Sequence, residues 1–444
     1  MASSDKDIIA AIATAPGRAG IGVVRLSGGN LETLIAAICR KPLIPRLATL
    51  SQFSGNAGDV IDTGLALSFP APNSYTGEHV LELQGHGGPV VLQRLLKHCL
   101  ALGARLAEPG EFSKRAYLNG KMDLAQAEGV ADLIDAATEE AARCAQRSVH
   151  GEFSTAVNQL GRQMTELRAL TEATLDFPEE EIDGSTRVDQ SHRLNELSKG
   201  LAHLIDASGQ GSLLREGAVV VLAGRPNAGK SSLLNRLAGE EVAIVTEIPG
   251  TTRDAIRQSI NLGGLPLHVV DTAGLRETQD AVEQIGVART WAAIEKADLA
   301  LLVIDATQGE TSEDRAIAGK LPPHLRWLRV YNKCDLAKRD AGRLEDTVVL
   351  SAKTGDGIDA LHSAIADAIG WRGEAEGIFM ARERHLVALR AAYAGVGRAA
   401  EQISRQELFS EELRLAHEAL MSITGEVTPD DLLGEIFSRF CIGK

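Results

Sequence analysis

A glycine-rich segment that ends in a lysine and a serine is the clearest chemical signal in this sequence. An apolar run precedes Gly224-Arg225-Pro226-Asn227-Ala228-Gly229-Lys230-Ser231, and helix-forming residues follow it. This order predicts a phosphate-binding loop between a strand and a helix, because backbone N–H groups and a helix N-terminus both favour an anion. Lys230 is expected to neutralise the β- and γ-phosphates during catalysis, and the Ser231 hydroxyl to bind Mg²⁺. The expected phosphate contacts are Asn227, Ala228, Gly229, Lys230, Ser231 and Ser232.

Two later segments predict that the base is guanine. Asn332-Lys333-Cys334-Asp335 follows an apolar run, and the Asp335 carboxylate can accept from the N1–H and the exocyclic amine of guanine. Adenine cannot supply that pairing, so a site built for it rejects adenine nucleotides. After the last predicted strand, a backbone contact to the guanine carbonyl is expected. The expected base contacts are Asn332, Lys333, Asp335, Ser351, Ala352 and Lys353. The predicted ligands are therefore GTP and GDP.

Two segments between these motifs are expected to respond to the terminal phosphate. In the run Asp271, Thr272, Ala273, Gly274, a carboxylate at a strand end can hold the water shell of magnesium, and a glycine N–H can face the γ-phosphate. A threonine of the earlier loop can complete the magnesium shell and release it after hydrolysis, and Thr252 is the better candidate. That loop contains Thr246, Glu247, Ile248, Pro249, Gly250, Thr251 and Thr252.

The residue after Gly274 bears on hydrolysis, because many signalling GTPases place a water-orienting glutamine there. Here it is Leu275, which cannot form a side-chain hydrogen bond, so another group and another positive charge are needed. The Asn227 side-chain carbonyl can ligate a monovalent cation that would act as an arginine finger does. The segment after Gly274 offers further candidates for these two roles, and residue chemistry does not choose among Arg276, Glu277, Asp280 and Glu283.

Composition changes along the chain predict the elements that position these motifs. Residues 1–120 have short apolar runs among glycines and prolines, which predicts an α+β domain with a helix near 90–102. Residues 121–215 and 373–444 have helical spacing. Residues 216–372 alternate strands with helices, which predicts a doubly wound, Ras-like α/β G domain inserted in one helical domain. Its predicted strands are 219–223, 267–271, 299–305, 328–332 and 347–350.

Bulk composition excludes several classes of protein. The net charge of −14 argues against indiscriminate binding of polyanions, so a nucleic acid is expected to meet only a local patch. No apolar run is long enough to span a bilayer, and the N-terminus lacks the basic-then-apolar order of a secretory signal. Five scattered cysteines fit reduced thiols in a cytoplasmic protein without membrane partners.

Several segments resemble the tRNA modification GTPase MnmE (TrmE) family. They are the loop with Asn227, residues 246–254 and 271–276, the terminal Cys441-Ile442-Gly443-Lys444, and the N-terminal stretches 15–18, 24–28, 81–88 and 109–113. The resemblance covers nearly the whole chain. It implies a homodimer whose hydrolysis is stimulated by K⁺, with Glu283 orienting the water and with Mg²⁺ at Ser231 and Thr252. The implied potassium contacts are Asn227, Thr246, Ile248 and Thr251.

The same resemblance implies a folate-binding N-terminal domain and a role in tRNA modification. A 5-formyltetrahydrofolate-type ligand would contact the positions that match here, which are Arg25, Glu82, Lys121 and Lys444. A pterin offers donors to a carboxylate, and its glutamate tail suits a cation. The implied reaction is a carboxymethylaminomethyl-type modification of the wobble uridine (position 34) of certain tRNAs. It would involve an FAD-dependent partner subunit in a heterotetramer.

Two questions stay open from the residues. A ribosome-assembly or switch GTPase, in which the nucleotide state controls docking, would share every G-domain motif. Only the tRNA-modification hypothesis predicts folate binding and a need for Lys444. Cys441, near the end of the chain, is either a nucleophile or part of a motif for docking a ligand or partner.

Overall fold

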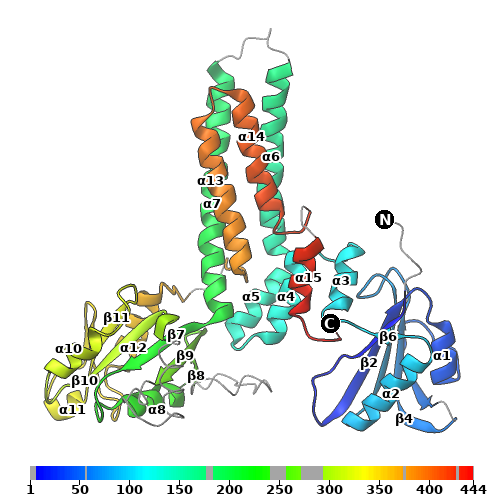
Figure 1. Cartoon of the computed structure of the whole chain (residues 1–444), viewed down its shortest axis with the longest axis horizontal. Helices are drawn as coiled ribbons and strands as arrows, with labels where there is room; N and C mark the ends of the chain where they lie inside the picture. The colour runs from blue at the N-terminus through cyan, green and yellow to red at the C-terminus, as the bar shows by residue number, and fades with distance from the viewer. Residues whose placement is uncertain are drawn as a thin grey trace. The chain divides into compact units, whose positions relative to one another are not determined.

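The chain divides into two compact units, each with its own hydrophobic core. One unit is Met1–Ala131 with Met421–Lys444, and the other is Asp132–Leu420 (Figure 1). The computed structural model describes residues 7–55, 58–176, 184–240, 257–271, 294–373, 377–426 and 430–443. The predicted division into 1–120, 121–215, 216–372 and 373–444 stays a prediction.

The first unit contains a six-stranded sheet in the order β3-β4-β5-β2-β1-β6. Its strands are β1 (Ile9–Ile12), β2 (Ala19–Gly28), β3 (Thr49–Ser54), β4 (Val60–Phe69), β5 (His79–Gly87) and β6 (Arg105–Leu106). β1 and β6 are parallel, and the other neighbours are antiparallel. Helices α1 (Glu32–Cys39) and α2 (Pro89–Ala101) pack on one face, where alternate residues such as Val24 and Leu26 point into the core. The predicted helix near 90–102 is confirmed as α2.

The C-terminal segment belongs to this first unit. Helix α15 (Asp430–Ser438) packs with α3 (Glu111–Leu118) and with the start of α4 (Leu124–Asp135) through an apolar cluster that includes Phe437. Beyond α15, Ile442 forms a β-bridge with Pro109, and the Gly110 N–H donates to the Cys441 carbonyl at 3.3 Å. Cys441 and Ile442 are therefore held beside the start of α3.

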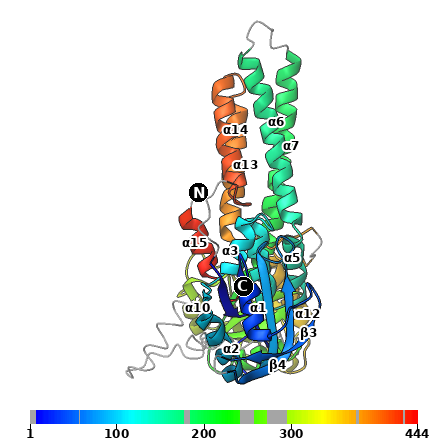
Figure 2. The same cartoon turned by 90° about the vertical axis from the view of Figure 1, so that its right-hand side faces the viewer.

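Five helices described in the second unit lie outside its α/β part and form a helical part. They are α5 (Glu139–Val149), α6 (Glu152–Asp176), α7 (Gly184–Glu216), α13 (Glu383–Glu401) and α14 (Gln406–Met421). Figure 1 and Figure 2 both show α6, α7, α13 and α14 side by side. The buried Asp132 carboxylate accepts from Arg215 at 3.0 Å and from Arg382 at 2.8 Å, which ties the end of α7 to the start of α13. Among the described residues, no helix combines the length and hydropathy that a membrane span requires.

The α/β part of the second unit is built on a seven-stranded sheet in the order β12-β13-β11-β10-β7-β9-β8. All neighbouring pairs are parallel except those of the edge strands β8 and β12, so the sheet is mixed. Its strands are β7 (Ala218–Ala223), β8 (Arg257–Leu262), β9 (Leu265–Asp271), β10 (Leu299–Asp305), β11 (Trp327–Asn332), β12 (Gly342–Leu344) and β13 (Thr347–Val349). The helices described with it are α8 (Lys230–Glu240), α10 (Ser312–Ala318), α11 (Cys334–Ala337) and α12 (Ile358–Ile369).

Candidate nucleotide site

The glycine-rich loop lies between β7 and α8, so its strand–loop–helix context is confirmed. The loop turns tightly, with φ of +61° at Asn227 and +98° at Gly229. A Cβ atom at position 229 would collide with Nδ2 of Asn332, so only glycine fits there. The buried Lys230 donates from Nζ to the carbonyls of Gly224 at 2.8 Å and Arg225 at 3.0 Å, which holds its charge inside the loop. This cradle and its lysine fit an anionic ligand.

Asn332 joins the phosphate loop to the two base-reading segments. This side chain is 2% exposed at the end of β11. Its Nδ2 donates to the Ala228 carbonyl at 3.0 Å, and its Oδ1 accepts from the N–H groups of Lys333 at 2.8 Å and Ala352 at 3.0 Å. The sequence predicted Asn332 as a contact to the base. In the structure, its amide group also holds three loops in one arrangement.

Lys333 makes a second connection between these loops. Its Nζ donates to the Asn227 carbonyl and to Oδ2 of Asp305, both at 2.7 Å. Burial raises the pKa of Asp305, but hydrogen bonds from Lys333 and Thr307 outweigh it and hold this pKa below its usual value. Sequence reasoning missed Asp305. The available signal was a carboxylate as the last residue of the buried strand β10, at the carboxyl ends of the parallel strands of the sheet.

The remaining described candidates lie around the same edge of the sheet. Ser231 and Ser232 are exposed on the first turn of α8, and the exposed Asp335 lies on α11. Ser351 and Ala352 are buried after β13, whereas Lys353 is exposed. The exposed Ser231 hydroxyl fits a Mg²⁺ ligand, because hard cations prefer oxygen ligands. The backbone of Asp271 ends β9, beside Leu222 of β7.

Several predicted residues lie outside the described part of the chain. They are Thr246, Glu247, Ile248, Pro249, Gly250, Thr251, Thr252, Thr272, Ala273, Gly274, Glu283 and Lys444, together with the alternatives Arg276, Glu277 and Asp280. The roles given to these residues therefore stay predictions.

The N-terminal candidates Arg25 and Glu82 lie opposite each other on β2 and β5. The Arg25 guanidinium bonds to Oε1 of Glu82 at 3.0 Å from Nε and at 2.9 Å from Nη2. It also stacks over the rings of Tyr75 and Phe112, with its Cζ 5.5 and 5.9 Å from their centroids. Lys121 donates to the Pro72 carbonyl at 3.2 Å. The structure thus brings Arg25 and Glu82 together, and Lys121 contacts the segment that also carries Tyr75.

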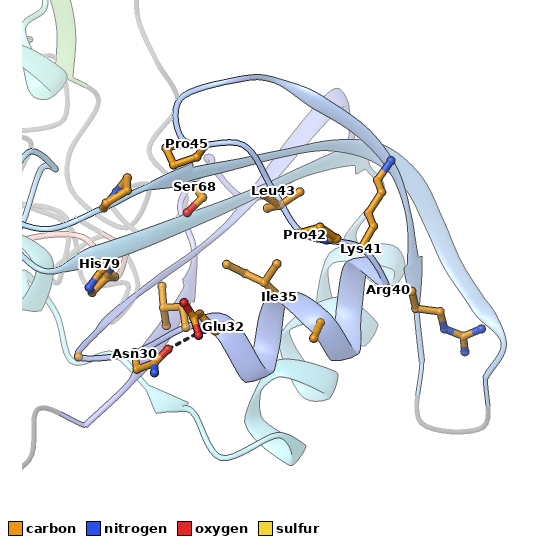
Figure 3. Close-up of a pocket in the computed structure, with 14 residues that line it drawn as sticks. Asn30, Glu32, Ile35, Arg40, Lys41, Pro42, Leu43, Pro45, Ser68 and His79 are labelled. Atoms are coloured by element: carbon orange, nitrogen blue, oxygen red, sulfur yellow. Dashed lines mark hydrogen bonds between the residues drawn. The ribbon is translucent and has the colours of Figure 1, made fainter.

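A separate hollow of about 800 Å³ lies between α1, the segment that follows α1 and the end of β4. Figure 3 shows Ile35 and Leu43 near its middle and Lys41 at one end. At the other end, Oδ1 of Asn30 accepts from the Glu32 N–H at 2.9 Å. None of the described folate candidates lines this hollow.

Comparison with known proteins finds similarity along the full chain. A family model described as the MnmE helical domain matches residues 124–441, and one described as the GTP-binding protein TrmE N-terminus matches residues 8–121. The tRNA modification GTPase MnmE of Nitrosomonas europaea is 58% identical over 451 residues, which cover 99% of this chain and 100% of that protein. The corresponding protein of Dechloromonas aromatica is 57% identical over 446 residues and 99% of both chains.

Among solved structures, Era of Aquifex aeolicus bound to GDP and AlF4⁻ is 28% identical to this chain. That match covers 40% of this chain and 66% of Era, with a TM-score of 0.28.

Proposed function

The chain belongs to the MnmE family of tRNA modification GTPases, and we propose that its potassium-stimulated hydrolysis of GTP serves modification of the wobble uridine of certain tRNAs. Family membership makes it a GTPase of tRNA modification. The observation that carries the nucleotide part of the proposal is the bridge made by Asn332. One buried amide connects the phosphate loop at Ala228 with the base-reading segment at Ala352, as a guanine-nucleotide pocket requires.

The described residues have distinct roles toward the nucleotide. Lys230 neutralises charge on the β- and γ-phosphates, and the exposed Ser231 hydroxyl would ligate Mg²⁺, with Thr252, outside the described residues, as a second ligand. Asp335 accepts two hydrogen bonds from guanine, and Lys333 keeps the base-reading segment tied to the phosphate loop. Magnesium, when bound, stabilises the charge that develops on the phosphate oxygens.

Potassium takes the place of a catalytic arginine in this proposal. Asn227 is exposed on the loop at a positive φ, and its side-chain carbonyl serves as one ligand. Thr246, Ile248 and Thr251 supply the others. Leu275 cannot orient water, and the resemblance to the MnmE family assigns that role to Glu283. Pairing of the G domains of a homodimer would enclose the cation and exclude water, which strengthens its electrostatic effect.

The N-terminal unit binds a 5-formyltetrahydrofolate-type ligand in this proposal. Glu82 would accept from the pterin, while Arg25, Lys121 and Lys444 would bind its carboxylates. The position of the C-terminal tail supports this assignment. The Cys441 carbonyl accepts from the Gly110 N–H, and a Cβ at Gly443 would meet the Ile12 carbonyl at the end of β1. The residue before Lys444 therefore lies against the N-terminal sheet. An FAD-dependent partner subunit, joined in a heterotetramer, would supply redox chemistry to the tRNA.

Steady-state GTP hydrolysis in potassium compared with sodium tests the proposed catalytic mechanism. The wild type should turn over much faster in potassium. Asn227→Lys should lose the potassium response and keep GDP binding, because the new ammonium occupies the position of the cation. Glu283→Ala should bind GTP and lose turnover. An unchanged potassium response in Asn227→Lys, or normal turnover in Glu283→Ala, would overturn the corresponding role.

Folate binding separates this proposal from a ribosome-assembly GTPase. The full chain should bind 5-formyltetrahydrofolate, and Arg25→Ala should weaken that binding while GTP hydrolysis stays unchanged. A chain that hydrolyses GTP and binds no folate would refute the folate part.

A further inference from the structure

Arg236 of α8 reaches across to the base-reading segment. Its Nε donates to the Ala352 carbonyl at 3.1 Å, and its Nη2 donates to the Lys353 carbonyl at 2.6 Å. The N–H of the same Ala352 donates to Oδ1 of Asn332 at 3.0 Å. The segment is therefore held on both sides, by an amide from β11 and by a guanidinium from the helix that follows the phosphate loop.

The planarity of the peptide bond makes this contact directional. The Ala352 carbonyl and the Lys353 N–H belong to one trans peptide unit, so they point in opposite directions. A guanidinium that fixes the carbonyl also fixes the direction of that N–H. Two hydrogen bonds from one planar group hold both carbonyls in register, which a flexible lysine cannot do.

We propose that Arg236 is a positioning residue for guanine recognition, which aims the Lys353 N–H at the 6-carbonyl of the base. This inference rests on the proposed guanine site. Arg236 also lines a hollow of about 420 Å³ with Ser232, Asn235, Gly239 and Ala352. Ser232 is among the predicted phosphate contacts and is four residues from Arg236, so both lie on the same face of α8.

The test compares GDP with 6-thio-GDP, whose sulfur is a poorer acceptor at the position that the Lys353 N–H addresses. Binding of each nucleotide to the full-length chain is measured by calorimetry. The wild type should prefer GDP. Arg236→Ala should bind GDP about tenfold more weakly, because two hydrogen bonds that orient the loop are lost. The preference for GDP over 6-thio-GDP should shrink in the same variant.

Arg326→Ala is the matched control, because Arg326 also donates to a backbone carbonyl, that of Ala368 at 3.3 Å, outside the nucleotide loops. Its GDP affinity should equal that of the wild type. Arg236→Lys keeps the charge and should show an intermediate loss, so the inference stays testable should Arg236→Ala unfold. Equal weakening of GDP and 6-thio-GDP, or unchanged affinities, would overturn the role of Arg236. A wild type without GDP affinity would refute the guanine site instead.

Discussion

Replacement of Asn332 by alanine should disconnect the phosphate loop from the base-reading segment. The change removes all three hydrogen bonds of this side chain. The Ala228 carbonyl then loses its donor, and the Ala352 N–H loses its acceptor. These two residues are 3% and 6% exposed, so water reaches the orphaned groups poorly. Each unsatisfied buried group costs about 1–3 kcal/mol. The nucleotide-competent arrangement should therefore lose about 4 kcal/mol, which corresponds to a rise of about a thousandfold in Kd.

Titration of the full-length chain with a fluorescent GDP analogue measures this effect, and circular dichroism checks that the variant is folded. Asn261→Ala is the matched control. Oδ1 of Asn261 also accepts from a backbone N–H, that of Gly264 at 2.8 Å, but in the turn between β8 and β9. The control should bind GDP as the wild type does. A folded Asn332→Ala variant whose Kd rises less than about tenfold would refute the reasoning, because the bridge would then contribute under about 1.4 kcal/mol.

Two further predictions concern stability. Burial raises the pKa of Glu111, but hydrogen bonds, among them those from Arg105 and Arg115, outweigh it and hold this pKa below its usual value. Its stabilisation is therefore complete above the unfolded pKa and is lost as pH falls through the folded pKa, which lies below 4.5. Glu111→Gln should therefore lose less thermal stability than the wild type between about pH 6 and about pH 3, and equal losses would contradict this. Thr138 Oγ1 donates to the Gly264 carbonyl at 2.8 Å and caps α5, so Thr138→Val should lose about 1–2 kcal/mol in urea unfolding and Thr138→Ser much less. Similar unfolding midpoints for the two Thr138 variants would rule out that contribution.

The five predicted strands of the α/β domain are confirmed within two residues at each end. They lie inside the sheet, and strands buried on both faces read as nearly continuous apolar runs. β8 and β12 were not predicted. Both are edge strands, and their polar residues, such as Arg257 and Arg343, give no apolar run. The mixed character of the sheet therefore became visible only in the structure.

Local order along the chain was enough to identify the nucleotide motifs. A lysine and a serine after a glycine-rich turn, or an asparagine and an aspartate after a strand, lie within a few residues of each other, and their chemistry depends on that spacing. The fold class followed for the same reason, because the alternation of strands and helices is also local.

The contacts between distant segments of the chain were decided only by the tertiary structure. Asn332 meets Ala228, Arg236 meets Ala352 and Ile442 meets Pro109, although each pair is separated by more than a hundred residues. In each pair at least one partner contributes only backbone groups, which nearly every residue type possesses. Such a partner leaves no mark in the sequence, so only the packing of the sheet and its helices selects which carbonyl or N–H is met.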